Sequence, residues 1–367
     1  MAIFAFYGVH GGPLEWEGIP IYPGGTEPWG NDVVTAYALH HMRGDRNSGW
    51  LMLLQDVWVM KSEALKNLHV AAWAPVDHTP APPAVVDFFK TTGAVPISMS
   101  KHGQQMFQDA GLNPIYVPHG IDTKQFAPRD DRDALREAMG IPTDAFVFGM
   151  VAANKGTTPP RKSFPQVFQA FAKFHAKHPD SILYLHTMKN KMHGGCVIPR
   201  LLEACGVPEK AVVYVDQFSY TLGDITMADM PMVYATMDVL VNPAYGEGFG
   251  MPIIEAQSCG VPVILADNTA MPELCGSGWL VPSEPYWDEE QGSWWGLPRW
   301  QDIYATMEKA YHVTDRMRRE AREFVVKDYD ADDITEKYWK PCLAELEEML
   351  QVPKADPVDM SAVLETV

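Results

Sequence analysis

The sequence has few cysteines and no long apolar run, and these absences exclude whole classes of protein. Its five cysteines are scattered through 367 residues, odd in number and without Cys-x-x-Cys spacing. We therefore expect reduced thiols rather than a disulfide framework or a zinc site. No apolar run reaches the length of a transmembrane helix. The first residues lack the basic region of a signal peptide, so we expect a cytoplasmic location.

Positive charge is also scarce. The chain carries 29 Lys and Arg residues against 47 Asp and Glu residues, which gives a formal net charge of −18. This balance favours solubility and disfavours nucleic acid and anionic membranes as partners, because both bind basic surfaces. Hydrophobic residues make up 47% of the chain, enough for sizeable cores, and the length is typical of two domains.

Short apolar runs alternate with helical stretches, which is the pattern of an α/β fold with parallel sheets. The predicted strands lie at 3–7, 50–54, 70–73, 95–99 and 115–117, and then at 146–151, 182–186, 212–215, 239–241 and 263–265. Helices are expected at 33–41, 82–89, 103–110, 133–139 and 334–350. The polar stretch at 128–133 places the change of domain near 125–145.

The most informative segment is the glycine-rich stretch 242–265. Three glycines alternate with Glu247 and Phe249 in a loop that follows an apolar strand, and a helix begins near Pro252. Glycines let backbone N–H groups approach a ligand, and the helix N-terminus favours an anion such as phosphate. Glu247 lies in the loop and Glu255 about one turn inside the helix. Both carboxylates would repel phosphate and should face hydroxyl groups. A sugar nucleotide offers both kinds of group.

This segment resembles the donor site of family 4 retaining glycosyltransferases, the glycosyl transferases group 1, which have the GT-B fold. The matching residues are Glu247 and Glu255, with seven residues between them, in Glu-Gly-Phe-Gly-Met-Pro-Ile-Ile-Glu-Ala. The resemblance implies two Rossmann-like parallel-sheet domains facing each other across a cleft, with no catalytic metal and no cofactor. It divides the chain into an acceptor-side domain at 1–135, a nucleotide-sugar domain at 136–330, a crossing helix at 331–352 and a flexible tail at 353–367.

The same resemblance implies roles for individual residues. Glu247 would hold the donor-sugar hydroxyls and stabilise an oxocarbenium-like transition state, while Glu255 would bind the nucleotide ribose. Lys162 would grip the donor diphosphate. His78, at the end of a first-domain strand, would orient the donor sugar, and Asp77 could orient His78. The alternative for His78 is an ordinary hydrogen-bonded loop histidine.

Further donor contacts follow from the resemblance. Where family members carry Gly-Arg, this chain has Asn154 or Lys155, and Arg161 is the candidate that replaces the lost cation. At least one cation is required because the departing diphosphate develops negative charge. A solvated loop cation is the alternative for Lys155. Gln217 lies where similar enzymes hold the nucleotide base, largely through backbone groups. The remaining predicted donor contacts are Gly248, Phe249, Gly250 and Met251.

Three other features have simpler explanations. Acidic pairs between 328 and 332 mimic a metal-binding Asp-x-Asp, but they precede a helix, where acidic residues act as N-terminal caps. His186 and His193 have loose spacing and no evident carboxylate partner, so we expect loop roles for both. The aromatic residues at 286–300 form either an acceptor-stacking surface or, as we expect, a packed covering loop.

The resemblance runs from residue 3 to about residue 350 and lacks the family's first β–α unit. That unit usually lines the acceptor pocket, so we expect altered or weakened acceptor binding. An apolar strand face left exposed would favour association. A homodimer is one way to cover it.

Together, these features predict a retaining, hexosyltransferase-like glycosyltransferase that moves a sugar from a nucleotide-diphosphate-sugar donor to a hydroxyl acceptor. Two alternatives stay open. The missing unit and the lost Gly-Arg would suit a nucleotide-sugar-binding protein with little or no transfer. A GT-B sugar-nucleotide epimerase would use the same donor site. The sequence does not identify the base, the sugar or the acceptor.

Overall fold

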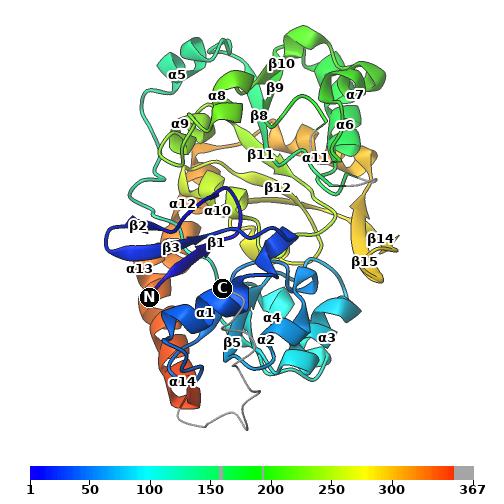
Figure 1. Ribbon diagram of the computed structural model, residues 1–367. Helices are drawn as coiled ribbons and strands as arrows, with labels where there is room; N and C mark the ends of the chain where they lie inside the picture. Colours follow the sequence, from blue (N-terminus) through cyan, green and yellow to red (C-terminus); the bar gives the residue numbers. More distant parts are fainter. Residues whose placement is uncertain (157–159, 192–193, 351–367) are drawn as a thin grey trace.

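The computed structural model describes residues 1–156, 160–191 and 194–350 and shows two α/β halves (Figure 1). The first half contains a four-stranded sheet and the second a six-stranded sheet, and every strand pair in both is parallel. The prediction of an α/β fold with two Rossmann-like parallel-sheet domains is therefore confirmed. The predicted flexible tail, 353–367, lies outside the described residues.

The six-stranded sheet of the second half has the order β10-β9-β8-β11-β12-β13 and is buried on both faces. Along β8, Val147 belongs to one apolar core and Phe148 to the other, as alternation along a strand requires. Helices α6 and α11 cover one face, and α9, α10 and α12 cover the other. The strands are β8 Phe146–Val151, β9 Ser181–His186, β10 Val212–Tyr214, β11 Val239–Asn242, β12 Val263–Ala266 and β13 Gly278–Val281.

The helices of the second half, with the linker helix that leads into it, are mostly short. They are α5 Arg132–Ala138, α6 Phe164–Lys177, α7 Ile198–Cys205, α8 Gln217–Leu222, α9 Met230–Ala235, α10 Met251–Ser258, α11 Trp300–Ala310 and α12 Asp315–Asp328. Two 3₁₀ turns, Glu209–Ala211 and Pro272–Leu274, precede strands β10 and β13.

The four-stranded sheet of the first half has the order β4-β5-β6-β7. Along β5, Ala72 belongs to a core shared with Phe88 and Phe89 of α3, and Ala71 belongs to a core on the opposite face. The strands are β4 Leu51–Leu53, β5 Val70–Ala74, β6 Val95–Ser98 and β7 Ile115–Tyr116. The helices are α2 Ser62–Leu65, α3 Pro83–Thr92 and α4 Lys101–Asp109, with a 3₁₀ turn at Val57–Val59.

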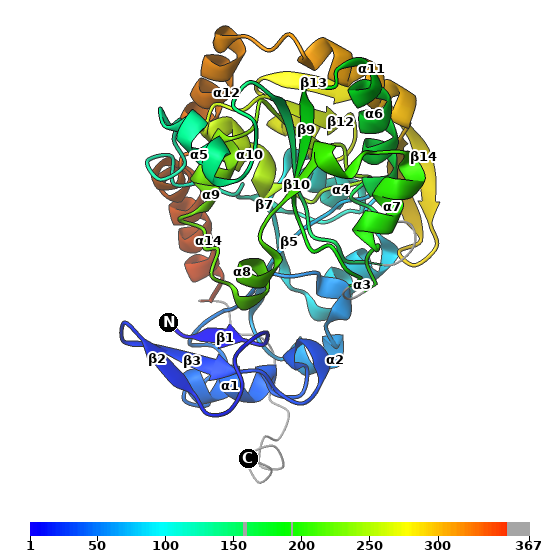
Figure 2. The ribbon, with the colours of Figure 1, turned by 90° about the horizontal axis from the view of Figure 1, so that it is seen from above.

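The first residues form a separate three-stranded sheet, which corrects the single strand predicted at 3–7. Strand β1 (Ile3–Ala5) pairs in parallel with β3 (Ile19–Pro23), and β2 (Leu14–Trp16) pairs with β3 in a hairpin. The hairpin forms because Glu17 and Gly18 both have positive φ, as a tight two-residue turn requires. Figure 2 shows this sheet and α1 (Val34–His41), which follows the turn Pro28–Gly30, apart from the larger sheets.

Apolar side chains of this small sheet face solvent. Leu14 is 55% exposed and Trp16 is 57% exposed. Their exposure agrees with the expectation that the first half leaves apolar surface uncovered. The predicted homodimer that would cover it stays a prediction.

The aromatic residues near 290 form a β-hairpin rather than the expected covering loop. Strands β14 (Ser283–Asp288) and β15 (Ser293–Pro298) pair in antiparallel register. The hairpin extends from the second half to the first, where the Thr79 amide donates to the Trp294 carbonyl at 3.0 Å. The predicted loop is wrong because aromatic residues favour paired strands, and each strand carries an adjacent pair of them, Tyr286-Trp287 and Trp294-Trp295.

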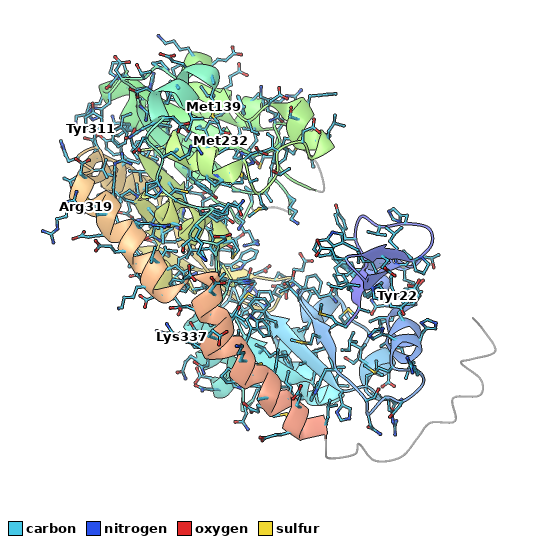
Figure 3. The ribbon with its side chains drawn as sticks, turned by 90° about the vertical axis from the view of Figure 1, so that its left-hand side faces the viewer. Tyr22, Met139, Met232, Tyr311, Arg319 and Lys337 are labelled. Carbon is cyan, nitrogen blue, oxygen red and sulfur yellow. The ribbon has the colours of Figure 1, made fainter. Side chains whose placement is uncertain are left out.

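The C-terminal helices run along both halves (Figure 3). After α12, the chain continues through α13 (Ala331–Ile334), a π-helical turn at Thr335–Trp339, and α14 (Lys340–Leu350). Asp330 accepts the amides of Asp332 and Asp333, so the predicted capping role of this acidic stretch is confirmed.

The π-helical turn and α14 pack against the face of the first-half sheet that lies opposite α3. The Trp339 ring lies 4.8 Å from Trp73, and the Trp50 Nε1–H donates to the Leu346 carbonyl at 2.9 Å. Leu346 is 1% exposed within this contact. Among the described helices, none is long and apolar enough to cross a membrane.

We predict that Leu346→Ala lowers the free energy of unfolding by about 2–5 kcal/mol, because it leaves a cavity between α14 and the sheet. Urea denaturation followed by circular dichroism measures the change. Leu343→Ala on the same helix is the matched control. Leu343 is 44% exposed, so its truncation should stay within about 0.5 kcal/mol. Equal effects of the two substitutions would contradict the packing described here.

Candidate functional site

The glycine-rich loop between β11 and α10 lies directly against the first half of the molecule. A Cβ at Gly246 would lie 2.0 Å from the Asp77 carbonyl oxygen, and one at Gly248 would lie 2.3 Å from the Pro75 Cβ. The sequence suggested that these glycines admit a ligand. The structure corrects that explanation, since both positions are filled by the loop after β5, and a side chain at either would push the halves apart. Gly250 needs glycine for a different reason, its φ of +107°.

Glu247 lies in this loop at the centre of a buried charge cluster. The residue is 6% exposed. One carboxylate oxygen pairs with the Lys162 ammonium, and the Arg161 Nη1 lies 3.6 Å from the other. Arg161 also donates to the Gly246 carbonyl at 2.8 Å and lies 3.7 Å from Asp77. The predicted residues Glu247, Lys162 and Arg161 are thus brought together, with Asp77 from the other half of the chain.

The ionisation of this cluster follows from burial and from the paired charges. Burial lowers the pKa of Lys162, and the positive charge of Arg161 lowers it further. Burial alone would raise the pKa of Glu247, but the charges of Lys162 and Arg161 outweigh it and lower the pKa. The same balance holds Asp77 at a pKa of about 2, because the hydrogen bond from His78 and the charge of Arg161 overcome its burial.

His78 faces this cluster from the end of the loop after β5. It is 2% exposed, its Nδ1 lies 2.8 Å from Asp77 Oδ1, and its ring stacks on Trp295 with 4.8 Å between centroids. Its Nε2 lies 3.1 Å from Asp288 Oδ2. The predicted orientation of His78 by Asp77 is present, and both ring nitrogens face carboxylate oxygens.

Asp288 is a site residue that the sequence analysis missed. It ends β14, and its side chain covers the His78 nitrogen that faces away from Asp77. The aromatic cluster around it was the available signal, since Trp295 of the paired strand stacks on His78. The hairpin is therefore part of the candidate site.

Glu255 lies in the second turn of α10, 6% exposed, and accepts a hydrogen bond from the Tyr234 hydroxyl at 2.6 Å. Burial raises its pKa, and the Tyr234 hydrogen bond lowers it in part. One carboxylate oxygen is held by Tyr234. The predicted contact of Glu255 with a ribose stays a prediction.

The side-chain amides of two predicted donor-binding residues, Asn154 and Gln217, form hydrogen bonds within the protein. The Asn154 amide nitrogen donates to the carbonyls of Met188 and Cys196, and its oxygen accepts the Cys196 amide. The Gln217 side chain accepts a hydrogen bond from the Lys189 amide and donates to the carbonyls of Thr187 and Val215, which follow β9 and β10. These contacts fix loops beside the sheet and occupy the side-chain amides of both residues. The predicted contact of backbone groups near Gln217 with the nucleotide base stays a prediction.

The other predicted donor contacts differ in exposure. Phe249 is 4% exposed and packs between His119 and Tyr329, which makes it part of the core between the halves. Met251 packs against the same core from the first turn of α10. Lys155 is exposed and forms an isolated bridge with Gly194.

Histidines outside the cluster do not form a metal centre in the part of the chain that the structure describes. His186 is buried beside Tyr220, and burial lowers its pKa to about 4. His193 lies outside the described residues. Across 1–156, 160–191 and 194–350, no group of three or more His, Cys, Asp or Glu side chains is placed to hold a metal ion.

Comparison with known proteins shows which sequences and folds this chain resembles. Residues 197–289 match the family model described as glycosyl transferases group 1. A D-inositol 3-phosphate glycosyltransferase of Saccharomonospora viridis is 30% identical over 212 residues, which cover 56% of this chain and 44% of that protein. An O-antigen chain mannosyltransferase B of Escherichia coli is 47% identical over 60 residues, 16% of each chain. The chain thus spans less than half the length of these curated relatives.

Solved structures share the architecture at low sequence identity. HepE of Anabaena, in complex with UDP and glucose, has a TM-score of 0.64 and 16% identity, over 89% of this chain and 87% of that one. A sucrose-phosphate synthase of Thermosynechococcus elongatus has a TM-score of 0.69 and 16% identity, over 92% and 86%. The fold is therefore the GT-B fold of glycosyltransferases, as the resemblance implied.

We predict that Asp77→Asn lowers the free energy of unfolding by about 2 kcal/mol at pH 7, because Asn keeps an acceptor for His78 but loses the charge paired with Arg161. The pKa of Asp77 is about 2 in the folded chain and 3.8 in its ordinary state. Its contribution is therefore present above pH 4 and is lost as the pH falls through 2.

Urea denaturation of the wild type and the variant at pH 7, 5 and 3 checks this expectation. The difference between them should narrow at the lowest pH. Asp224→Asn, at an exposed carboxylate, is the control and should follow the wild type throughout. A difference that stays constant with pH would contradict the assigned role of Asp77.

Proposed function

We propose that the chain is a retaining glycosyltransferase that moves a sugar from a nucleotide-diphosphate-sugar donor to a hydroxyl acceptor. The observation that carries the proposal is the buried cluster of Glu247, Lys162 and Arg161, which meets Asp77 and His78 where the two halves of a GT-B fold touch. The fold, the matched family model and the UDP complexes of a similar structure support a nucleotide-sugar donor.

The leaving group determines what the cations do. Departure of a nucleoside diphosphate develops negative charge on its phosphate oxygens, and a fixed cation in a water-poor site stabilises that charge. Lys162 and Arg161 are such cations, each with side-chain exposure of 36% or less. In the proposal they bind the diphosphate together with backbone amides of the loop and the α10 N-terminus.

Donor binding must then rearrange the ion pair between Lys162 and Glu247. A diphosphate would compete with the Glu247 carboxylate for the ammonium, and the released carboxylate would accept the donor-sugar hydroxyls. Both groups stay paired at each stage, which avoids an isolated buried charge. Glu255 would hold the ribose, and His78 would orient the sugar from the first half.

The acceptor side is formed by other residues. Asp56 lies after β4. Desolvation and the nearby negative charge of Asp77 raise its pKa more than the positive charge of Arg161 lowers it. The proposal places the attacking hydroxyl on this side of the sugar. The proposed reaction involves no covalent nucleophile. The leaving phosphate helps to deprotonate the acceptor hydroxyl.

A donor panel tests the proposed activity. The full chain is incubated with UDP-, GDP- and ADP-sugars, with and without simple glycoside acceptors, and the released nucleoside diphosphate is measured. We expect release with one donor class, unchanged by EDTA because the mechanism uses no metal. Proton NMR of the product should show the anomeric configuration of the donor. An inverted anomer would contradict the retaining mechanism.

We predict that Glu247→Gln lowers kcat at least about 100-fold with that donor, because the sugar hydroxyls and the developing positive charge lose their carboxylate. Initial rates of nucleotide release measure the effect. Glu284→Gln, at an exposed position of the hairpin, is the control and should retain the wild-type rate. The unfolding midpoint of each variant separates lost chemistry from lost folding. Full activity in a folded Glu247→Gln chain would refute the assignment.

A second candidate function rests on Asn154. The resemblance implies an arginine at the position of Asn154 or Lys155, and Asn154 is a buried neutral amide, so this second function applies where Arg161 does not replace that cation. A nucleotide-sugar-binding protein with little transfer would show donor binding by calorimetry and no released nucleotide. A GT-B epimerase would instead convert the donor sugar without an acceptor.

A further inference from the structure

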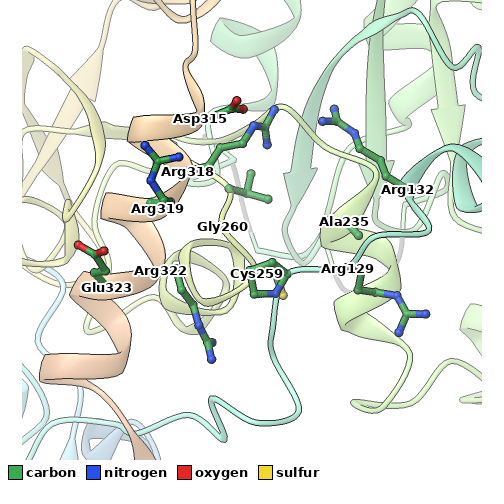
Figure 4. Close-up of a pocket in the computed structure, with 12 residues that line it drawn as sticks. Arg129, Arg132, Ala235, Cys259, Gly260, Asp315, Arg318, Arg319, Arg322 and Glu323 are labelled. Carbon is green, nitrogen blue, oxygen red and sulfur yellow. The ribbon is translucent and has the colours of Figure 1, made fainter.

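A pocket lined by five arginines lies apart from the Glu247 cluster (Figure 4). It has a volume of about 380 Å³. Helix α12 provides one wall, and the linker before α5, the end of α9 and the turn after α10 provide the others. The arginines are Arg129, Arg132, Arg318, Arg319 and Arg322, with Asp315 and Glu323 as the lining carboxylates.

This pocket is separate from the cluster around Glu247. Helix α10 has eight residues and is therefore about 12 Å long. Its first residue follows the glycine loop, and the turn after its last residue, Cys259–Gly260, lines the arginine pocket. None of the lining residues takes part in the proposed donor site.

The arginines exceed the carboxylates that could neutralise them. Arg132, Arg136 and Arg318 all pair with Asp238, at 2.5, 2.9 and 2.7 Å. Arg132 and Arg318 bind the same carboxylate oxygen, so their guanidinium groups lie close together on one side of the pocket, and Figure 4 shows the two side chains pointing toward one another. One negative charge therefore serves three positive ones.

Arg129 has its own partner, Asp131, at 2.6 Å, but two further arginines are positioned without a carboxylate. Arg322 donates to the carbonyls of Phe126, Thr123 and Ser258, which hold its guanidinium in place but carry no charge. Arg319 is exposed and forms no ion pair with any other described residue. The Nε–H of Arg132 is buried and has no hydrogen-bond partner within the described chain.

Such a concentration is unusual in this chain, where acidic residues outnumber basic ones by 47 to 29. The planar fork of arginine matches the geometry of phosphate oxygens, and several fixed guanidinium groups bind a phosphate more strongly than one. The volume lies within the range of small-molecule pockets, about 300–1,000 Å³. Since a water molecule occupies about 30 Å³, there is room for roughly a dozen heavy atoms.

We propose that this pocket binds a small soluble anion with two linked phosphate groups, held between Arg132 and Arg318 on one side and Arg319 and Arg322 on the other. The ligand would supply the negative charge that Asp238 alone does not provide. The site is distinct from the donor site and holds whether or not the chain transfers sugar.

Isothermal titration of the full chain with pyrophosphate at low ionic strength tests the proposal. The pocket variant is Arg132→Gln/Arg319→Gln. It should fold, because Asp238 keeps Arg136 and Arg318 as partners and Arg319 has no ion pair among the described residues to lose. The control, Arg316→Gln/Lys327→Gln, removes the same charge from α12 outside the pocket, at side chains that are 81% and 80% exposed.

We expect the wild type and the control to bind pyrophosphate alike and the pocket variant to lose at least about tenfold in affinity, since two guanidinium contacts are removed. Pyrophosphate bound beside Lys162 is common to all three proteins and does not affect the difference. Equal binding by all three, an equal loss in the control, or no binding by the wild type would overturn the proposal.

Two further probes define the ligand class. Orthophosphate should bind more weakly than pyrophosphate, with the same dependence on the pocket residues. Vesicles of phosphatidylcholine with an anionic phospholipid should show no pocket-dependent binding. Pocket-dependent capture of vesicles without binding of pyrophosphate would assign the site to a membrane headgroup and overturn the soluble anion.

Discussion

The contact between the glycine loop of the second half and the loop after β5 determines where every candidate catalytic group lies. Gly246 and Gly248 have no room for a side chain, since Asp77 and Pro75 occupy the space. This close approach brings Arg161, which also pairs with Glu247, within ion-pair distance of Asp77 from the other half. Without it, the carboxylates and cations of the site would belong to two separate surfaces.

Burial then gives these charges their character. Exposed ion pairs contribute little, whereas charges buried between two domains interact strongly and must be matched. The cluster satisfies this requirement with two cations, Arg161 and Lys162, against Glu247 and Asp77. The arginine pocket behind α10 is not matched in the same way, because Asp238 faces three guanidinium groups. A ligand of the arginine pocket would therefore have to supply more negative charge than a ligand of the Glu247 cluster.

Much of the architecture could be predicted from sequence because buried parallel strands are short, continuous apolar runs. Strand β8 was predicted at 146–151 and has those bounds. The hairpin of β2 and β3 was missed, because β2 is exposed and the two strands mix Pro and Glu with apolar residues, which weakens the signal. Asp288 was missed for another reason. Its contact with His78 joins positions 210 residues apart, and no local pattern encodes it.

The sequence by itself determined the α/β class and the parallel sheets through local periodicity, and the resemblance of its ordered motif to a known family pointed to Glu247, Lys162 and Arg161 as a set. Tertiary structure alone decided that Asn154 and Gln217 are bound by neighbouring loops, that two glycines serve contact between the halves, and that five arginines from α12 and a distant linker share one pocket. The physical reason is that packing across the fold assigns the partners of each polar group, and those partners lie far away in the chain.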